Sequence, residues 1–200
     1  MKYLKPLSLL SFLALLTQLG CTASVRPSIS SSEFLTNEKK IPTNVALYVT
    51  DEFRNYSSSQ TDILEGRKWK LELGPATTDA LRYALESRFE KVTIHVGQPK
   101  FPIELPDGYL VVVPTFDSVK QTGPIFVKFE KYHVTITMTV CVYDPAGLGL
   151  KKMTLTGKGD KAGSIGAGPT GFAALPEASR YAIKQLVDQI LQNLMELSVK

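Results

Sequence analysis

The amino-acid sequence predicts an α+β fold for residues 41–200, with a mainly antiparallel sheet of about five or six strands and two helices packed on one face. Apolar and polar residues alternate through residues 132–144, as expected for a strand with one buried face. Apolar residues recur at helical spacing in two segments, one after Gly74 and one after Pro176. Short turns join several of the strand-like segments, and short connections favour antiparallel neighbours.

Short apolar runs and residue spacing predict the elements in the first half of this domain. A proline is tolerated in the first turn of a helix, so Gly74-Pro75 marks a helix start. The expected elements, in chain order, are a strand at 44–50, a loop at 51–67, a half-buried strand at 69–73, a helix at 74–89, and strands at 92–96 and 109–113.

The segment 132–144 predicts the clearest strand. Its apolar face holds Val134, Ile136, Met138, Val140 and Val142, and its other face holds Thr135, Thr137, Thr139 and Cys141. The apolar residues at 125, 127 and 129 are in the opposite phase, which predicts a bulge or turn near Glu130 and Lys131. A tight turn at 144–147 predicts a hairpin with a strand at 150–159. The glycines at 157, 159 and 163 indicate a mobile connection after it.

The first twenty residues have the three zones of an export signal. Lys2 and Lys5 supply positive charge, residues 7–16 supply a short apolar core, and Gly20 is a small residue before Cys21. A transmembrane helix is the alternative interpretation. It needs about 20 predominantly apolar residues, and serine, threonine and glutamine interrupt this run. We therefore expect residues 1–20 to be a signal peptide that is removed.

The stretch Gln18-Leu19-Gly20-Cys21 resembles the lipobox of bacterial lipoproteins, although Gln18 stands where a small aliphatic residue or leucine is usual. The resemblance implies lipidation of Cys21. With Thr22 as the second mature residue, it also implies an outer-membrane location facing the periplasm. The alternative is ordinary secretion with cleavage after Ala23. Several acyl chains on one residue would give a stable anchor, because each buried CH₂ contributes about 0.8 kcal/mol.

Residues 21–40 are rich in serine and lack regular apolar spacing, which predicts a flexible tether from the lipidated cysteine. A docking role for Phe34 and Leu35 is an alternative. The remaining residues, 41–200, are enough for one periplasmic domain. Acylation of Cys21 would leave Cys141 without a partner, whereas an unlipidated chain could form a Cys21–Cys141 disulfide.

The balance of charge excludes a general nucleic-acid binder. Without Lys2 and Lys5 the chain has 21 basic and 19 acidic residues, and nucleic-acid binding needs a concentrated basic surface. The sequence has a local basic cluster at Lys151, Lys152, Lys158 and Lys161. These lysines favour an exposed sheet edge, with contact to anionic lipid or polysaccharide as the alternative.

No catalytic, metal or cofactor motif is complete in the sequence, so we expect no enzyme activity and no cofactor. Gly166, Gly168 and Gly171 match G-x-G-x-x-G, but no second parallel strand can follow the helix that comes next. The two histidines, His95 and His133, do not fit a zinc motif and are expected at exposed strand positions. A hydrolase is the alternative, using a carboxylate pair such as Asp117 with Asp160, or showing activity that depends on Asp117 or on His133.

The lipobox, the helix sequence GPATTDALRYALESRF, the strand-rich middle and the final helix together resemble small outer-membrane lipoproteins of the YajG, LptE and CsgG-amino-domain type over residues 41–197. This resemblance implies an accessory protein that binds an envelope protein or itself during assembly, transport or export. A second hypothesis is a glycolipid- or polysaccharide-binding module. Its candidate contacts are the threonine row with Trp69, Tyr132 and Tyr143 as apolar platforms.

Overall fold

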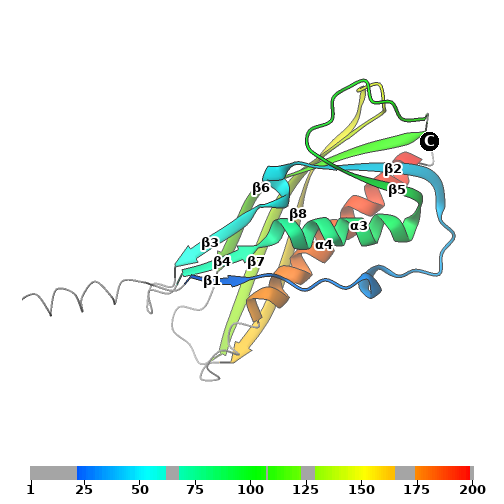
Figure 1. Ribbon diagram of the computed structural model, residues 1–200. Helices are drawn as coiled ribbons and strands as arrows, with labels where there is room; N and C mark the ends of the chain where they lie inside the picture. Colours follow the sequence, from blue (N-terminus) through cyan, green and yellow to red (C-terminus); the bar gives the residue numbers. More distant parts are fainter. Residues whose placement is uncertain (1–21, 62–67, 107, 123–128, 165–173, 199–200) are drawn as a thin grey trace, which may run out of the picture.

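The computed structural model describes residues 22–61, 68–106, 108–122, 129–164 and 174–198 (Figure 1). Its main sheet has five strands in the order β5-β2-β6-β7-β8. Their bounds are β2 Ile41–Val49, β5 Phe89–Val96, β6 Tyr109–Thr122, β7 Phe129–Tyr143 and β8 Gly149–Ser164. A second sheet has three strands in the order β1-β4-β3, namely β1 Thr22–Val25, β3 Ser57–Thr61 and β4 Lys68–Glu72.

The main sheet is mixed, so the prediction of a mainly antiparallel sheet is only partly right. β2 pairs in parallel with both of its neighbours, β5 and β6. β7 pairs antiparallel with β6 and with β8. The β2–β5 pair is parallel because the chain leaves β2, passes through helix α3 (Leu73–Arg88) and returns beside it as β5. The connection after β5 then brings β6 to the other side of β2, again in parallel. The sequence contains this strand-helix-strand unit, but β3 and β4 of the small sheet lie between β2 and α3 in the chain and make the unit hard to recognise.

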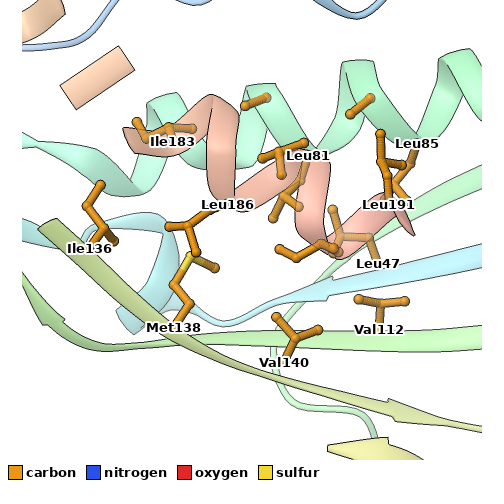
Figure 2. Close-up of a cluster of buried hydrophobic side chains, with 14 of the residues drawn as sticks. Leu47, Leu81, Leu85, Val112, Ile136, Met138, Val140, Ile183, Leu186 and Leu191 are labelled. Atoms are coloured by element: carbon orange, nitrogen blue, oxygen red, sulfur yellow. The ribbon is translucent and has the colours of Figure 1, made fainter. Parts of the chain in front are cut away.

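Helices α3 and α4 (Ala174–Ser198) cover one face of the main sheet, as the sequence predicts (Figure 1). Side chains from the helices meet apolar residues of three central strands, β2, β6 and β7. Figure 2 shows this core, which includes Leu47, Leu81, Leu85, Val112, Ile136, Met138, Val140, Ile183, Leu186 and Leu191. Most of these side chains are completely buried, so the five alternating apolar residues of β7 form the floor of the core.

Two glycines of β8 allow α4 to approach the sheet closely. A Cβ atom at Gly157 would lie 2.0 Å from the carbonyl oxygen of Ala182, and one at Gly159 would lie 1.8 Å from that of Ala178. Any side chain at these positions would collide with the backbone of α4. The expectation of a mobile connection at 157, 159 and 163 is therefore wrong, because all three residues lie in β8. Glycine here serves close packing.

The hairpin of β7 and β8 forms as predicted, but the expected bulge near Glu130 and Lys131 does not occur. β7 pairs with β8 without a shift from Phe129 to Val142, and the register shifts only next to Tyr143. A second shift lies in the β6–β7 ladder, between Phe116 and Ser118. The out-of-phase residues Ile125 and Val127 lie outside the described residues.

Residues 51–67 contain more regular structure than the predicted loop. The short helix α2 (Asp51–Arg54) begins after Thr50, whose hydroxyl accepts a hydrogen bond from the Phe53 N–H at 3.0 Å. Strand β3 follows and pairs with β4. The serines of β3 lack the apolar alternation that identifies a strand, so this strand depends on its neighbour for its conformation.

The segment from Thr22 to Lys40 packs on the body, contrary to the expected tether. β1 pairs in parallel with β4, and the 3-10 helix η1 (Ser31–Phe34) has a capping box formed by Ser30 and Glu33. Phe34 is only 7% exposed and belongs to the main core, whereas Leu35 is 76% exposed. The composition of this segment predicted disorder because few of its residues are apolar. Those few, Val25, Ile29 and Phe34, pack against the main core.

Candidate functional site

The best candidate for a functional surface is the face of β6, β7 and β8 that points away from the helices. We call it the open face. Alternate side chains of β7 and β8 point to it, while those between them point to α4. Its members are Thr115, Asp117, Ser118, Lys120, Thr122, His133, Thr135, Thr137, Thr139, Cys141, Lys152, Thr154, Thr156, Lys158 and Asp160. The face is therefore polar, as the sequence predicts for the threonine row.

Hydroxyl groups lie in a row across the middle of the open face and form two hydrogen-bonded groups. The Thr139 hydroxyl donates to an Asp117 carboxylate oxygen at 2.8 Å and lies 3.2 Å from the Thr154 hydroxyl. Because the Thr139 proton points to Asp117, the proton between the two threonines comes from Thr154. The hydroxyl oxygens of Thr137 and Thr156 lie 3.4 Å apart.

These contacts orient threonine side chains on two adjacent strands. Neighbouring strands lie about 4.8 Å apart, and side chains on one face of a strand recur about every 6.7 Å. The open face thus presents regularly spaced hydroxyl groups on a twisted sheet. Such a surface suits an extended partner that offers hydrogen-bonding groups, whereas a small molecule generally needs a concave site.

The register shift in β6 places Asp117 in the row. Asp117 lies between Phe116, which pairs with Met138, and Ser118, which pairs with Thr137, so it is the extra residue of the irregularity. Its carboxylate is exposed and bound by Thr139. The sequence offered a signal for this, because an aspartate interrupts an apolar strand there. Sequence reasoning nevertheless assigned Asp117 only to a possible carboxylate pair.

The predicted carboxylate pair does not form. Asp160 lies opposite His133 in the β7–β8 ladder, and its carboxylate is 2.6 Å from the His133 Nδ1 atom. Asp117 binds Thr139, which lies six residues after His133 on β7. Six residues of a strand span about 20 Å, so neither Asp160 nor His133 can share a reacting group with Asp117. The Asp117–Asp160 pair considered from the sequence is therefore not formed.

The two histidines occupy different surroundings. The His133 side chain is 49% exposed, as predicted, and forms the cross-strand pair with Asp160. His95 on β5 is half-buried and stacks on Tyr48, with ring centroids 4.6 Å apart and an interplanar angle of 11°. Among the described residues, no group of three or more histidine, cysteine, aspartate or glutamate side chains could hold a metal ion.

A small apolar cluster borders the open face at its other end. The connection from β5 to β6 crosses the sheet on the side opposite the helices, and the Ile103 N–H donates to the Pro145 carbonyl at 2.8 Å. Phe101 and Tyr143 meet with ring centroids 5.1 Å apart. The cluster comprises Ala46, Tyr48, Phe101, Ile103, Leu105, Tyr109, Val111, Val113 and Tyr143. On this side of the main sheet, the cluster covers β2 and the start of β6. The open face is accessible over the remainder of β6 and over β7 and β8.

Cys141 and Tyr143 lie at this border. The Cys141 thiol is free and half-buried. Its hydrogen bond to the Tyr143 side chain raises the pKa of that phenol, and burial and the charge of an ionised Cys141 raise it further. Tyr143 is consequently neutral at physiological pH and offers a hydroxyl rather than a charge.

The three candidate ligand platforms do not come together. Trp69 lies in β4 of the small sheet, opposite Ala23 and Gln60, and its side chain is outside the described part of the structure. Tyr132 is partly buried against the helix-side core. Tyr143 is on the other face of the main sheet, in the apolar border. An aromatic platform made from these residues is therefore not formed.

The four clustered lysines lie on β8, which is an edge strand of the described sheet, as the edge interpretation predicts. Two of them contact α4, because Lys151 lies 3.5 Å from Glu196 and Lys161 lies 2.5 Å from Glu177. Lys152 and Lys158 are exposed on the open face. The lysines are thus divided between two faces and do not form one basic patch.

The described residues also line two shallow grooves. One, of about 290 Å³, lies between η1 and the two long helices and includes Leu35, Arg88 and Met195. The other, of about 450 Å³, lies at the hairpin end of the sheet and includes Tyr109, Asp144 and Leu150. In the first groove Arg88 is already paired with Glu38. Neither groove gathers unpaired catalytic groups.

Two sequence predictions lie outside the described residues. Cys21, the expected lipidation site, directly precedes β1. The glycines of the G-x-G-x-x-G pattern fall in residues 165–173, between β8 and α4. Within the described residues, no helix is both long and apolar enough to cross a membrane.

Neither a protein-family model nor a curated protein matches this chain. Among solved structures, a Xanthomonas campestris protein of family DUF330 has a TM-score of 0.54 at 12% identity, covering 90% of this chain and all of that one. A hypothetical protein from Chlamydia trachomatis has a TM-score of 0.49 at 12% identity, covering 78% of this chain and 98% of its own. Rare lipoprotein B from Shewanella oneidensis has a TM-score of 0.45 at 12% identity, covering 78% and 97%. The chain therefore shares its fold with the Xanthomonas protein.

Proposed function

We propose that this chain is a lipid-anchored accessory protein of the bacterial envelope that binds another protein and has no enzyme activity. Acylated Cys21 would hold it in the outer membrane, facing the periplasm, where it would serve assembly, transport or export. The partner would be an envelope protein or a second copy of the chain. Nucleic acid is not an expected partner.

The open face supports this proposal. Most hydroxyl groups of its central row already bond to one another or to Asp117, so the surface is ordered before a partner arrives. The remaining lone pairs, together with exposed Lys152 and Lys158, can bind carbonyl and carboxylate groups of a protein surface.

Site-specific crosslinking in intact cells tests this interface. A photoreactive amino acid would replace Thr154 or Thr156, which are exposed on the open face, and Gln192, which is exposed on α4, would serve as the matched control. We expect one envelope protein, or the chain itself, to be captured from both threonine positions and not from position 192. Equal capture from all three positions, or no capture from the threonines, would contradict the proposal.

The anchor needs a separate test. Mass spectrometry of the mature protein should show an acylated cysteine at its first position, and Cys21→Ser should abolish that product. An unmodified amino terminus, or a chain still beginning at Met1, would refute the anchor.

Binding of a glycolipid or polysaccharide is the second candidate function, favoured by the regular spacing of the threonine hydroxyls. It predicts retention of the protein on lipopolysaccharide or peptidoglycan, with loss of retention in a Thr137→Val, Thr154→Val variant. Retention that does not change in this variant would remove the open face as the binding surface.

A further inference from the structure

The connection between the expected lipid anchor and the folded body is extremely short. β1 begins at Thr22, the residue directly after Cys21. Consecutive Cα atoms lie 3.8 Å apart, so acyl chains on Cys21 would be attached one residue from the start of β1. A free segment of about nineteen residues would instead span roughly 25 Å.

Backbone pairing and side-chain contacts hold this segment in place. Thr22 to Val25 pair in register with Lys68 to Leu71, and the Ser24 hydroxyl donates to Glu72 at 2.6 Å. Arg26 binds the Asp79 carboxylate at 2.8 Å. Charged contacts continue further along, where Arg180 lies 3.1 Å from Glu33.

Apolar contacts secure the same segment. Val25 and Ile29 pack against the main core, and Phe34 is buried in it. Burial of a phenylalanine side chain stabilises a structure more than an exposed ion pair does. The segment is therefore fixed at several points and not only at β1.

The geometry points to a membrane-facing end of the molecule. We propose that the end formed by the start of β1, the end of β3 and the start of β4 lies against the phospholipid bilayer that holds the acyl chains of Cys21. This inference rests on the proposed lipidation and deepens it, because it makes the bilayer a second partner of the folded body. The body is then held at the headgroups, and unpairing of β1 together with the contacts that follow it would be needed to release the body.

The opposite end of the molecule then projects away from the bilayer. The sixteen residues of β8 span about 50 Å, and Figure 1 shows the β7–β8 turn far from the start of β1. Leu148 in this turn is 66% exposed. Lys70, which lies opposite Ser24 in the small sheet, is exposed at the proposed membrane end.

Fluorescence quenching in vesicles tests this orientation. The acylated full chain would carry Cys141→Ser, so that a label reacts only with a cysteine introduced as Lys70→Cys or Leu148→Cys, since the sulfur of acylated Cys21 is blocked. Each labelled protein would be reconstituted into phosphatidylethanolamine–phosphatidylglycerol vesicles that contain a headgroup-labelled quencher lipid. We expect quenching of the label at position 70 to exceed that at position 148 severalfold. Equal quenching, or stronger quenching at position 148, would overturn the proposal.

A linker insertion provides the matched control. About fifteen glycine and serine residues inserted between Cys21 and Thr22 span roughly 20 Å. This insertion should reduce quenching at position 70 toward the level at position 148, and unchanged quenching would count against the short connection.

Hydrogen exchange on the unlabelled acylated protein gives a second measurement that needs no variant. In the vesicle-bound protein, we expect the backbone amides of Thr22–Val25 to be protected from hydrogen exchange. Complete exchange of this segment within seconds would refute the proposal. The outcomes also separate this inference from the proposed function. An unacylated Cys21 overturns both the anchor and the docking, while equal quenching with a captured partner overturns only the docking.

Discussion

The two faces of β7 differ in what they contact and therefore in what they tolerate. On the helix side, the residues from Val134 to Val142 at even positions are at most 1% exposed and touch side chains of both long helices or neighbouring strands. On the open side, the residues between them are half-buried, and two of them, Thr137 and Thr139, contact threonine hydroxyls of β8. One strand thus supplies the floor of the core and a surface for binding, and substitutions on its two sides should have separable effects.

The largest difference is expected between Ile136→Ala and Thr137→Ala. Ile136 is fully buried, and its truncation leaves a cavity that should lower the free energy of unfolding by about 2–5 kcal/mol. Thr137 loses only a long contact to Thr156, so the loss should stay below about 1 kcal/mol. Urea denaturation of both variants measures this, and similar losses would contradict the division between the two faces.

The close approach of α4 gives the next largest effect. Gly159→Ala forces a Cβ against the backbone of Ala178 and should cost about 1–3 kcal/mol. Gly149→Ala is the matched control, because the nearest atom to its Cβ is 4.0 Å away, on the Tyr143 ring. Thermal unfolding should show a lower melting temperature for the variant at 159 and little change at 149. A harmless Gly159→Ala would mean that α4 does not pack this closely.

The hydroxyl row should contribute less to stability. In a double-mutant cycle of Thr139→Val with Asp117→Ala, we expect a coupling of about 0.5–1.5 kcal/mol, since a hydrogen bond to a charged group lies at the upper end of the usual range. Thr156→Val with Asp117→Ala is the control and should show additive losses, because these side chains share no hydrogen bond in the structure. Additivity in both cycles would indicate that the row is not formed in solution.

The exposed pair of Lys161 and Glu177 should have the smallest effect, and it should depend on pH. Its hydrogen bond lowers the pKa of Glu177 and raises the pKa of Lys161. A lowered carboxyl pKa stabilises the folded state at neutral pH, and this contribution is lost as the pH falls through the folded pKa of Glu177. A raised amine pKa contributes below the ordinary lysine range and is lost as the pH rises through the folded pKa of Lys161.

Melting temperatures of the wild type and Glu177→Gln, measured between neutral and acidic pH, check this prediction. The difference should be greatest near neutrality, shrink on acidification and decrease with salt. A difference that grows on acidification would have the wrong sign.

The parts of the fold that depend on local pattern were predictable. The alternation through 132–144 identified β7 and its core face, and the spacing of residues such as Leu81 and Leu186 identified both long helices. The parallel pairing of β2 with β5 and β6 depends on how distant segments meet. No local pattern encodes that choice.

The candidate site was likewise predictable only where it depends on local pattern. The sequence predicted the threonine row from its period, but it could not show that Asp117 joins the row, because this depends on a register shift between two strands. The order of residues 22–40 was missed for a related reason. The composition describes the whole segment, but the segment is ordered largely because one side chain, Phe34, packs into a core formed by residues from other parts of the chain.

The edge of β8 is closed by α4. The Gln185 side chain accepts from the Lys158 N–H at 2.6 Å, and the Gln189 side-chain amide donates to the Thr156 carbonyl at 3.1 Å. Because α4 follows all five strands of the main sheet in the sequence, the edge of β8 stays exposed in a folding chain until this final helix docks. During that interval the chain is open to aggregation through β8, so the rate at which α4 docks sets how long this edge is at risk.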